Sequence, residues 1–169
     1  MIEHIGVLDT NAILEMVLEG GIREEVPFPS LQFHLTLVQN IEADVEANML
    51  ISLNSLNHVI AAGAFPSFGN FVYYMPLRQV YLSYRMPVNP EDFDAAITDM
   101  RYILGVLYEQ LDLFMDFILY AANSPDGVSI DDYMDYLDEV ADLDDIIARS
   151  NLLLARMENG DFSNEEEET

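Results

Sequence analysis

Three histidines, His4, His34 and His58, are the side chains best suited to bind a metal ion or to transfer protons near neutral pH. None has a second histidine three or four residues away, the spacing that puts two ligands on one helix face. The chain has no cysteine, which excludes disulfides, thiolate nucleophiles and cysteine zinc sites. We therefore expect ordinary surface or hydrogen-bonded histidines, and neither a metal site nor a cofactor.

Carboxylates form a second group that could do chemistry, and they are concentrated between residues 131 and 145. A calcium loop of the EF-hand type needs Asp-x-Asp-x-Asp-Gly and a glutamate at its end, and the Asn-Ser-Pro-Asp-Gly turn at residues 123–127 lacks that spacing. Paired carboxylates can act as general acid and base, but on an exposed helix face we expect them to be solvated. The sequence also has no glycine-rich phosphate loop and no Gly-x-Ser-x-Gly motif. It therefore predicts a protein that is not an enzyme and has no catalytic residues. The acids of this cluster are Asp131, Asp132, Asp135, Asp138, Glu139, Asp142, Asp144 and Asp145.

Aromatic side chains are candidates for binding rather than for catalysis. Two segments that we expect to be strands are rich in tyrosine, and together with nearby phenylalanines they carry more rings than one core face can use. One interpretation is a docking surface, because such rings are enriched at protein interfaces. The other is that both sides of the strands are covered within the monomer. The candidate residues are Phe65, Phe68, Phe71, Tyr73, Tyr81 and Tyr84.

Two asparagines, Asn54 and Asn57, lie one helical turn apart in the segment Leu-Asn-Ser-Leu-Asn at residues 53–57. Asparagine is a mediocre helix former because its side chain competes for backbone groups. These two side chains could bond a following loop or a strand edge, and we include them among the candidate protein-binding residues. Helix capping and solvent exposure is the interpretation that the sequence favours.

The charge balance restricts the class of partner. The chain has 31 acidic residues and 6 basic ones, all arginine, for a formal net charge of −25. Such a field repels nucleic acid and anionic membranes, because binding a phosphate backbone needs cations. It favours solubility, basic partners, or a surface that imitates phosphates. We expect no direct contact with nucleic acid or membrane.

Membrane insertion and export are also not expected. The most apolar window, Ile103 to Ala122, is interrupted by Glu109, Asp112 and Asp116, which are too costly at mid-membrane. The first ten residues lack the basic and apolar parts of a signal peptide. The sequence therefore predicts a cytoplasmic protein.

The first half of the chain predicts a mixture of helix and strand. Residues 10–19 fit a short helix ended by Gly20 and Gly21, although the same residues also alternate like a strand. Residues 31–38 alternate cleanly and predict a half-buried strand. A helix is expected over residues 44–61, closed by Gly63; if it starts later, residues 41–47 extend the strand instead.

The second half has clearer signals. Residues 71–75 and 79–86 predict an antiparallel hairpin. Asn89 and Pro90 predict the start of a long helix that runs to about residue 122. Ser129 and Asp132 resemble a capping box, so a helix should follow, with a second one restarting near residues 142–145. The acidic end is expected to be disordered.

The order of these elements resembles the YbjN and type III secretion chaperone superfamily. The resemblance rests on the leucine- and asparagine-rich helix end at Leu50–Phe65, the aromatic strand pair at Phe71–Val88 and the helix start at Pro90–Leu111. Val80–Val88 is similar to the apolar strand that closes on Arg-x-Pro in class I secretion chaperones. The N-terminal region is short or altered, and residues 126–169 extend beyond the usual end, so the dimer mode and the client do not carry over.

The resemblance implies an α+β fold, with a twisted antiparallel sheet packed by helices and a helical C-terminal extension. It implies frequent homodimerisation and non-catalytic binding of protein segments. The expected organisation is an α+β domain over residues 1–125, a helical extension over 126–159 and a disordered acidic tail over 160–169. We expect a chaperone-like or regulatory adaptor that binds a protein or peptide client through its aromatic surface and a sheet edge. The alternative is an acidic DNA mimic that inhibits a nucleic-acid-binding protein.

Overall fold

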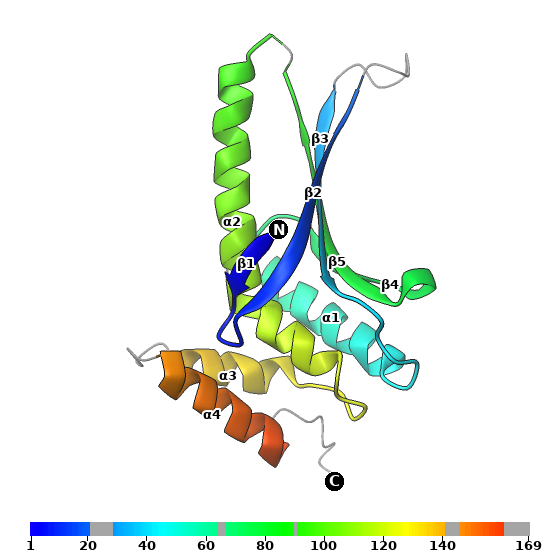
Figure 1. Cartoon of the computed structure of the whole chain (residues 1–169), viewed down its shortest axis with the longest axis vertical. Helices are drawn as coiled ribbons and strands as arrows, with labels where there is room; N and C mark the ends of the chain where they lie inside the picture. Colours follow the sequence, from blue (N-terminus) through cyan, green and yellow to red (C-terminus); the bar gives the residue numbers. More distant parts are fainter. Residues whose placement is uncertain (21–28, 64–66, 90, 141–145, 161–169) are drawn as a thin grey trace.

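The structure is a computed structural model that describes residues 1–20, 29–63, 67–89, 91–140 and 146–160. Its strands form one five-stranded antiparallel sheet in the order β1-β2-β3-β5-β4, and four α-helices lie on one side of the sheet and at its lower end, which confirms the α+β fold (Figure 1). The elements in chain order are β1 (Ile2–Ile5), β2 (Thr10–Glu19), β3 (Ser30–Val38), α1 (Glu46–Ala61), β4 (Asn70–Tyr74), the short 3₁₀ helix η1 (Met75–Leu77), β5 (Gln79–Pro87), α2 (Phe93–Ala121), α3 (Ile130–Val140) and α4 (Ile146–Asn159).

The central strand β3 confirms the alternation predicted for residues 31–38. Phe33 and Leu35 are fully buried on the face that carries the core, which we call the inner face. Leu35 lies opposite Leu14 of β2 on one side and Leu82 of β5 on the other. His34 belongs to the opposite, outer face, because successive side chains of a strand point to opposite sides. This alternation explains why the helices pack against the inner face of the sheet.

The helix expected at residues 10–19 is wrong, because these residues form strand β2. Ile13 to Glu19 pair residue by residue with β3. The sequence fits both periods, so its local pattern cannot choose between them. Pairing with a strong neighbouring strand decides the outcome, since strand preference depends on cross-strand packing more than on intrinsic tendency.

Helix α1 agrees with the prediction for residues 44–61 to within two residues at its start. Gly63 follows its end with a φ of +84°, a left-handed conformation that glycine adopts without strain. Residues 41–45 form a loop and turn rather than an extension of β3. The hairpin of β4 and β5 is confirmed as well, with η1 as its connection.

Helix α2 begins later than the Asn-Pro signal indicates. Its N-cap is Asp92, whose side chain accepts a hydrogen bond from the Ala95 amide at 3.0 Å. Asn89 instead accepts a bond from the Glu91 amide and closes the preceding turn. The expected apolar stripe is buried only in the C-terminal half of α2. At its N-terminal end Phe93 is 64% exposed, because the upper part of α2 stands beside the sheet beyond β1 and the other helices (Figure 1).

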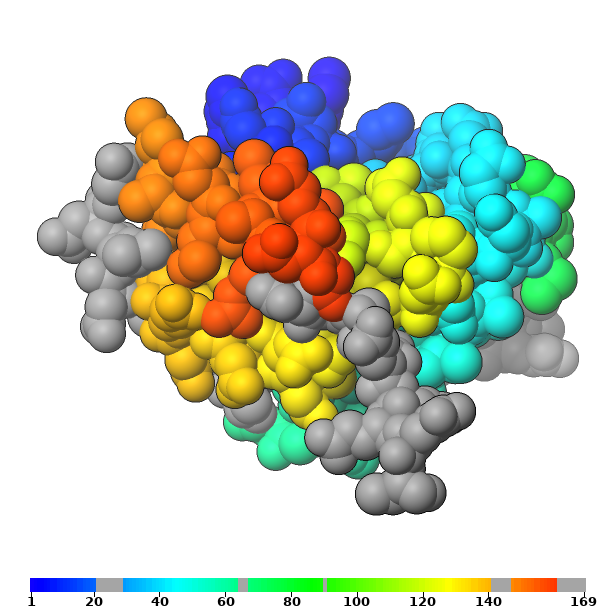
Figure 2. Space-filling view, turned by 90° about the horizontal axis from the view of Figure 1, so that it is seen from below, coloured from blue at the N-terminus to red at the C-terminus, as the bar shows by residue number. Residues whose placement is uncertain are grey.

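Helices α3 and α4, which follow the predicted boundary at residue 126, contribute buried residues to the same hydrophobic core as the sheet. Tyr133 of α3 packs against Phe117 of α2 with ring centroids 5.3 Å apart, and its hydroxyl donates to the Leu113 carbonyl. Leu153 of α4 is buried in that core. The Ser129 hydroxyl accepts a hydrogen bond from the Asp132 amide at 3.3 Å, as the predicted capping box requires. Seen from below, α3, α4 and the end of α2 form one continuous surface (Figure 2).

Several predictions fall outside the described residues. These are the position of Phe65, the restart signal at Asp142 and Asp145, and the expected disorder of the acidic end beyond Gly160. Among the described residues, no helix combines the length and the apolar character that crossing a membrane requires.

Candidate functional site

The candidate aromatic residues do not form one surface. Phe71 and Tyr73 point from β4 into the core and are buried. The Tyr73 hydroxyl donates to the Glu46 carboxylate at 2.9 Å, so its polar tip is already bonded within the chain. Phe71 and Tyr73 therefore line no exposed surface in this conformation.

Phe68 and Tyr84 close the space between the sheet and α2. Their rings pack at 4.7 Å, and the Phe68 ring meets the edge of Tyr102 on α2 at 6.0 Å. The Phe68 amide donates to the buried side-chain oxygen of Gln110 at 3.1 Å. Phe68 and Tyr84 are both half-buried, and their rings pack against the core of the monomer.

Tyr81 is the member of the set that lies on the outer face of the sheet. It is half-buried, and its ring packs on His34 of β3 at 4.7 Å. The other two histidines lie elsewhere: His58 is exposed on α1, and His4 of β1 bonds Asp9 at 2.6 Å. That bond raises the pKa of His4. Within the described residues, no three histidine or carboxylate side chains are grouped so as to hold a metal ion.

The two candidate asparagines have different roles. Asn54 is exposed, as the favoured interpretation predicts. Asn57 instead donates to the Phe71 carbonyl at 2.8 Å and accepts from the Phe71 amide at 3.0 Å. Since these two backbone groups of β4 bond to Asn57 rather than to β5, they point to the outer edge of the sheet. Asn57 thus satisfies the outward backbone groups of one residue of the edge strand β4 from within the chain.

The opposite edge of the sheet is left open. Strand β1 pairs with β2 only at Ala12 and Thr10. Beyond that point, β2 residues Ile13–Glu19 pair with β3 on one side, and no described strand occupies the other. We call this unpaired side of Ile13–Glu19 the open β2 edge. An unpaired strand presents a row of backbone donors and acceptors that can pair with another chain.

Apolar side chains accompany the open β2 edge on both faces of the sheet. Met16 and Leu18 lie on the inner face and are 49% and 65% exposed. Ile13 and Val17, on the outer face, are also more than half exposed. Natural edge strands are usually short, charged or covered, so a long apolar edge of this kind indicates a place where another strand binds. The sequence signal for this strand is the alternation of Leu14, Met16 and Leu18, which is the alternative to the helix expected at residues 10–19.

Two carboxylates of α2 hold the turn that precedes β2. Asp112 accepts from the Gly6 amide at 2.9 Å, and Asp116 accepts from the amides of Val7 and Leu8 at 2.7 and 3.2 Å. Burial raises the pKa of Asp116, and these two amide bonds oppose the rise. Two of the three acids that interrupt the apolar window of the sequence, Asp112 and Asp116, therefore anchor β1 and its turn at the lower end of β2.

A hollow of about 600 Å³ lies between α1 and the start of α3. Its lining includes Ser55, Ser129, Asp126 and Asp131. The lining has no histidine or basic side chain that could pair with these carboxylates and hydroxyls to form an acid–base or nucleophile–base couple. The open β2 edge is therefore the stronger candidate site.

Neither the models of known protein families, nor the curated proteins, nor the solved structures include a match to this chain.

Proposed function

We propose that this chain is a non-enzymatic binding protein that takes up an extended segment of another protein as an additional strand on the open β2 edge. The single observation that supports this proposal most is the exposure of Ile13–Glu19, a long apolar strand with one unpaired side. The chain would act as a chaperone-like protein or an adaptor, as its resemblance to secretion chaperones implies.

Strand addition suits the two needs of a client-binding protein. Backbone hydrogen bonds supply affinity that does not depend on the client's sequence, and alternate side chains supply selectivity. On the opposite edge of the sheet, Asn57 already bonds both backbone groups of Phe71, so a strand added there would have to displace it. Tyr81, which is half-buried on the outer face of β5, adds an aromatic ring to the surface that a client could contact.

The test compares Leu18→Lys with Ile147→Lys. Leu18 lies on the open β2 edge, whereas Ile147 of α4 is a matched control because it is also 65% exposed. A lysine at position 18 puts a charge where the bound strand must pack, so we expect the wild type and Ile147→Lys, but not Leu18→Lys, to retain client proteins from a source-cell extract. Hydrogen exchange of the wild-type complex should show new protection of the amides of residues 13–19. Equal retention by both variants, or protection confined to other elements, would contradict the proposal.

Homodimerisation, which the family resemblance implies, would use the same open β2 edge. Two antiparallel β2 strands from two copies could pair across it, and such a dimer would compete with the client. Sedimentation equilibrium of the wild type and of Leu18→Lys shows whether a dimer uses this edge. A dimer formed at the open β2 edge should dissociate in the variant, whereas a dimer formed elsewhere should persist.

The second candidate function is the acidic DNA mimic. Asp131, Asp135 and Asp138 are all exposed, and their spacing places them along one side of α3. A basic nucleic-acid-binding protein would be the target, and its binding should weaken steeply as salt screens the charges. Binding that survives Leu18→Lys but is lost when these three aspartates are changed to asparagine would favour this function.

A further inference from the structure

We infer that the segment bound at the open β2 edge is cationic: an extended stretch of another protein in which apolar residues alternate with lysine or arginine. This inference rests on the proposed function and adds the chemistry of the partner to it. Successive side chains of an added strand point to opposite faces of the sheet. The two faces beside the open β2 edge differ, and each selects one of the two alternate sets.

The inner face beside the open β2 edge is apolar. Met16 and Leu18 lie opposite Phe33 and Leu31 of β3, and both are about half exposed or more. A strand added here places every second side chain next to them. Each apolar side chain buried at such a site contributes through the hydrophobic effect, so this set of partner residues is apolar.

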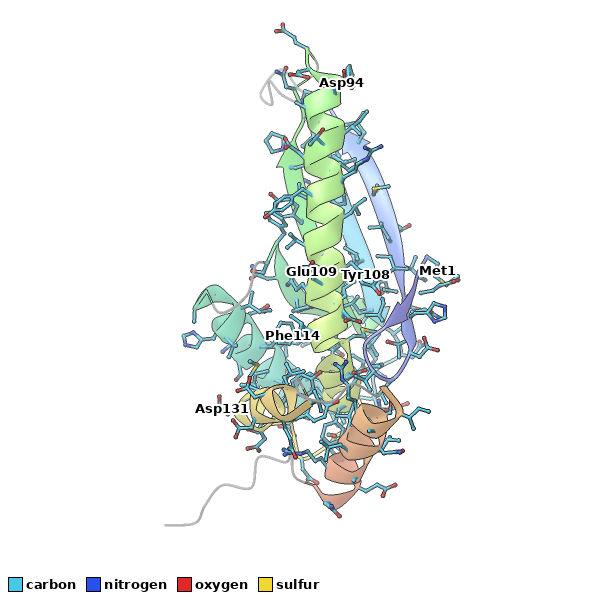
Figure 3. All side chains as sticks on the ribbon, turned by 90° about the vertical axis from the view of Figure 1, so that its left-hand side faces the viewer. Met1, Asp94, Tyr108, Glu109, Phe114 and Asp131 are labelled. Atoms are coloured by element: carbon cyan, nitrogen blue, oxygen red, sulfur yellow. The ribbon has the colours of Figure 1, made fainter. Side chains whose placement is uncertain are left out.

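Helix α2 continues the apolar lining on that side. Tyr108 identifies which side of α2 faces β1, because its hydroxyl donates to the His4 carbonyl at 3.3 Å (Figure 3). Leu104, Ile97 and Phe93 lie four, eleven and fifteen residues before Tyr108, which places them along the same side of the helix. Ile97 and Phe93 are 42% and 64% exposed, beyond the point that β1 reaches. An added strand would therefore lie between β2 and the upper half of α2, in line with β1.

The outer face beside the open β2 edge carries two glutamates, whereas the inner face carries none. Glu15 and Glu19 alternate with Ile13 and Val17 along it. Glu19 is paired with Arg85 at 2.8 Å, whereas Glu15 is exposed and has no ion pair within the described part of the chain. A lysine or arginine on the outward set of an added strand would lie next to Glu15. Opposite charges on neighbouring strands stabilise their pairing.

The charge of the surroundings points the same way. Along its whole length α2 carries Arg101 as its only basic residue, against five acids. The net charge of −25 attracts a basic segment over long range and opposes the approach of a second copy of the same chain. Charge complementarity thus favours a cationic partner over self-association at this edge.

Four synthetic peptides that match Ile13–Glu19 in length test the inference on the full chain. Three alternate valine with lysine, with serine or with glutamate, and the fourth has the composition of the lysine peptide with its lysines grouped at one end. By fluorescence anisotropy at low salt, the alternating lysine peptide should bind at least about fivefold more tightly than each of the other three. Its affinity should fall as salt is added. Binding should be lost in Leu18→Glu, which adds a favourable charge but removes the apolar contact.

A charge exchange supplies the decisive comparison. Glu15→Lys should weaken binding of the lysine peptide by about two- to fivefold and strengthen that of the glutamate peptide by a similar factor. Glu158→Lys is the matched control, because it changes the net charge equally at an exposed position on α4. It should change the affinity of each peptide by less than Glu15→Lys does.

The failure of this inference can be told apart from that of the proposed function. The inference of a cationic partner is wrong if the serine peptide binds as tightly as the lysine peptide, or if Glu15→Lys acts no differently from Glu158→Lys. Loss of binding in Leu18→Glu would still support strand addition in that case. If the lysine peptide binds but Leu18→Glu retains it, the contact is a general attraction to an acidic surface. In that case both the inference and the proposed site are overturned.

Discussion

At the scale of single residues, Asn57 ties helix α1 to the edge strand β4. Its side-chain amide replaces a neighbouring strand by bonding both backbone groups of Phe71. An amide can do this because it carries a donor and an acceptor side by side. The asparagine one turn earlier, Asn54, is exposed. The spacing in the sequence places both asparagines near each other on the helix, but it does not show which of them bonds the strand.

Substitution of Asn57 by alanine should therefore destabilise the protein by about 1–3 kcal/mol, because two half-buried backbone groups lose their partner. Asn54→Ala is the matched control and should be neutral or slightly stabilising, since alanine is the better helix former. Urea unfolding measures both changes. Equal effects of the two substitutions would show that the bonds to Phe71 contribute nothing to stability.

At the scale of elements, the position of β1 decides how much of β2 stays unpaired. Asp112 and Asp116 of α2 bond three successive amides of the turn between β1 and β2, and Ser150 of α4 donates to the Val7 carbonyl at 3.1 Å. These bonds hold the turn against α2 at the lower end of the sheet. They place β1 beside the start of β2, and no described strand lies along the rest of this edge.

Gly6 is a residue of this turn where a side chain would be strained and crowded. Its φ is +68°, and a Cβ added there would lie 2.6 Å from a carboxylate oxygen of Asp116. We expect Gly6→Ala to destabilise the protein by about 1–3 kcal/mol and to increase hydrogen exchange at residues 6–8.

Gly105 provides the control for that substitution. It lies within α2, and a Cβ there would meet no atom within 4 Å. Gly105→Ala should stabilise the protein by about 0.5–1 kcal/mol, because alanine favours the helix. Opposite signs for the two substitutions in urea unfolding support the anchored turn, whereas a stabilising Gly6→Ala would contradict it.

At the scale of the whole molecule, charge opposes the compact state. A net charge of −25 on 169 residues brings many carboxylates close together, and their mutual repulsion destabilises the folded chain. Raising the ionic strength from about 0.01 to about 0.15 M shortens the screening length from ~30 to ~8 Å. We therefore expect the free energy of unfolding at neutral pH to increase with sodium chloride.

The same measurement near pH 4.1, the isoelectric point indicated by the sequence, is the control. The net charge approaches zero there, so added salt should have little effect on stability. An equal salt dependence at both pH values would show that screening of net repulsion is not its cause.

Local patterns in the sequence predicted the elements whose signals do not depend on distant neighbours. Strand β3, the hairpin of β4 and β5, helix α1 and the body of α2 all follow from periodicity and turn residues. Strand β1 had no local signal, and residues 10–19 were ambiguous because their apolar residues fit a helix and a strand equally well. The start of α2 moved from Asn89 to Asp92, since either side chain can cap and only the geometry of the preceding turn chooses between them.

The sequence by itself determined the composition, the charge, the α+β class and the set of residues from which a surface could be built. Only the tertiary structure decided which of them are exposed. It buried Phe71 and Tyr73, tied Asn57 to the backbone of Phe71, and placed β1 beside the start of β2 only, with no described strand along the rest of that edge. The physical reason is that edges and faces of a sheet are defined by contacts between segments far apart in the chain, which no local period encodes.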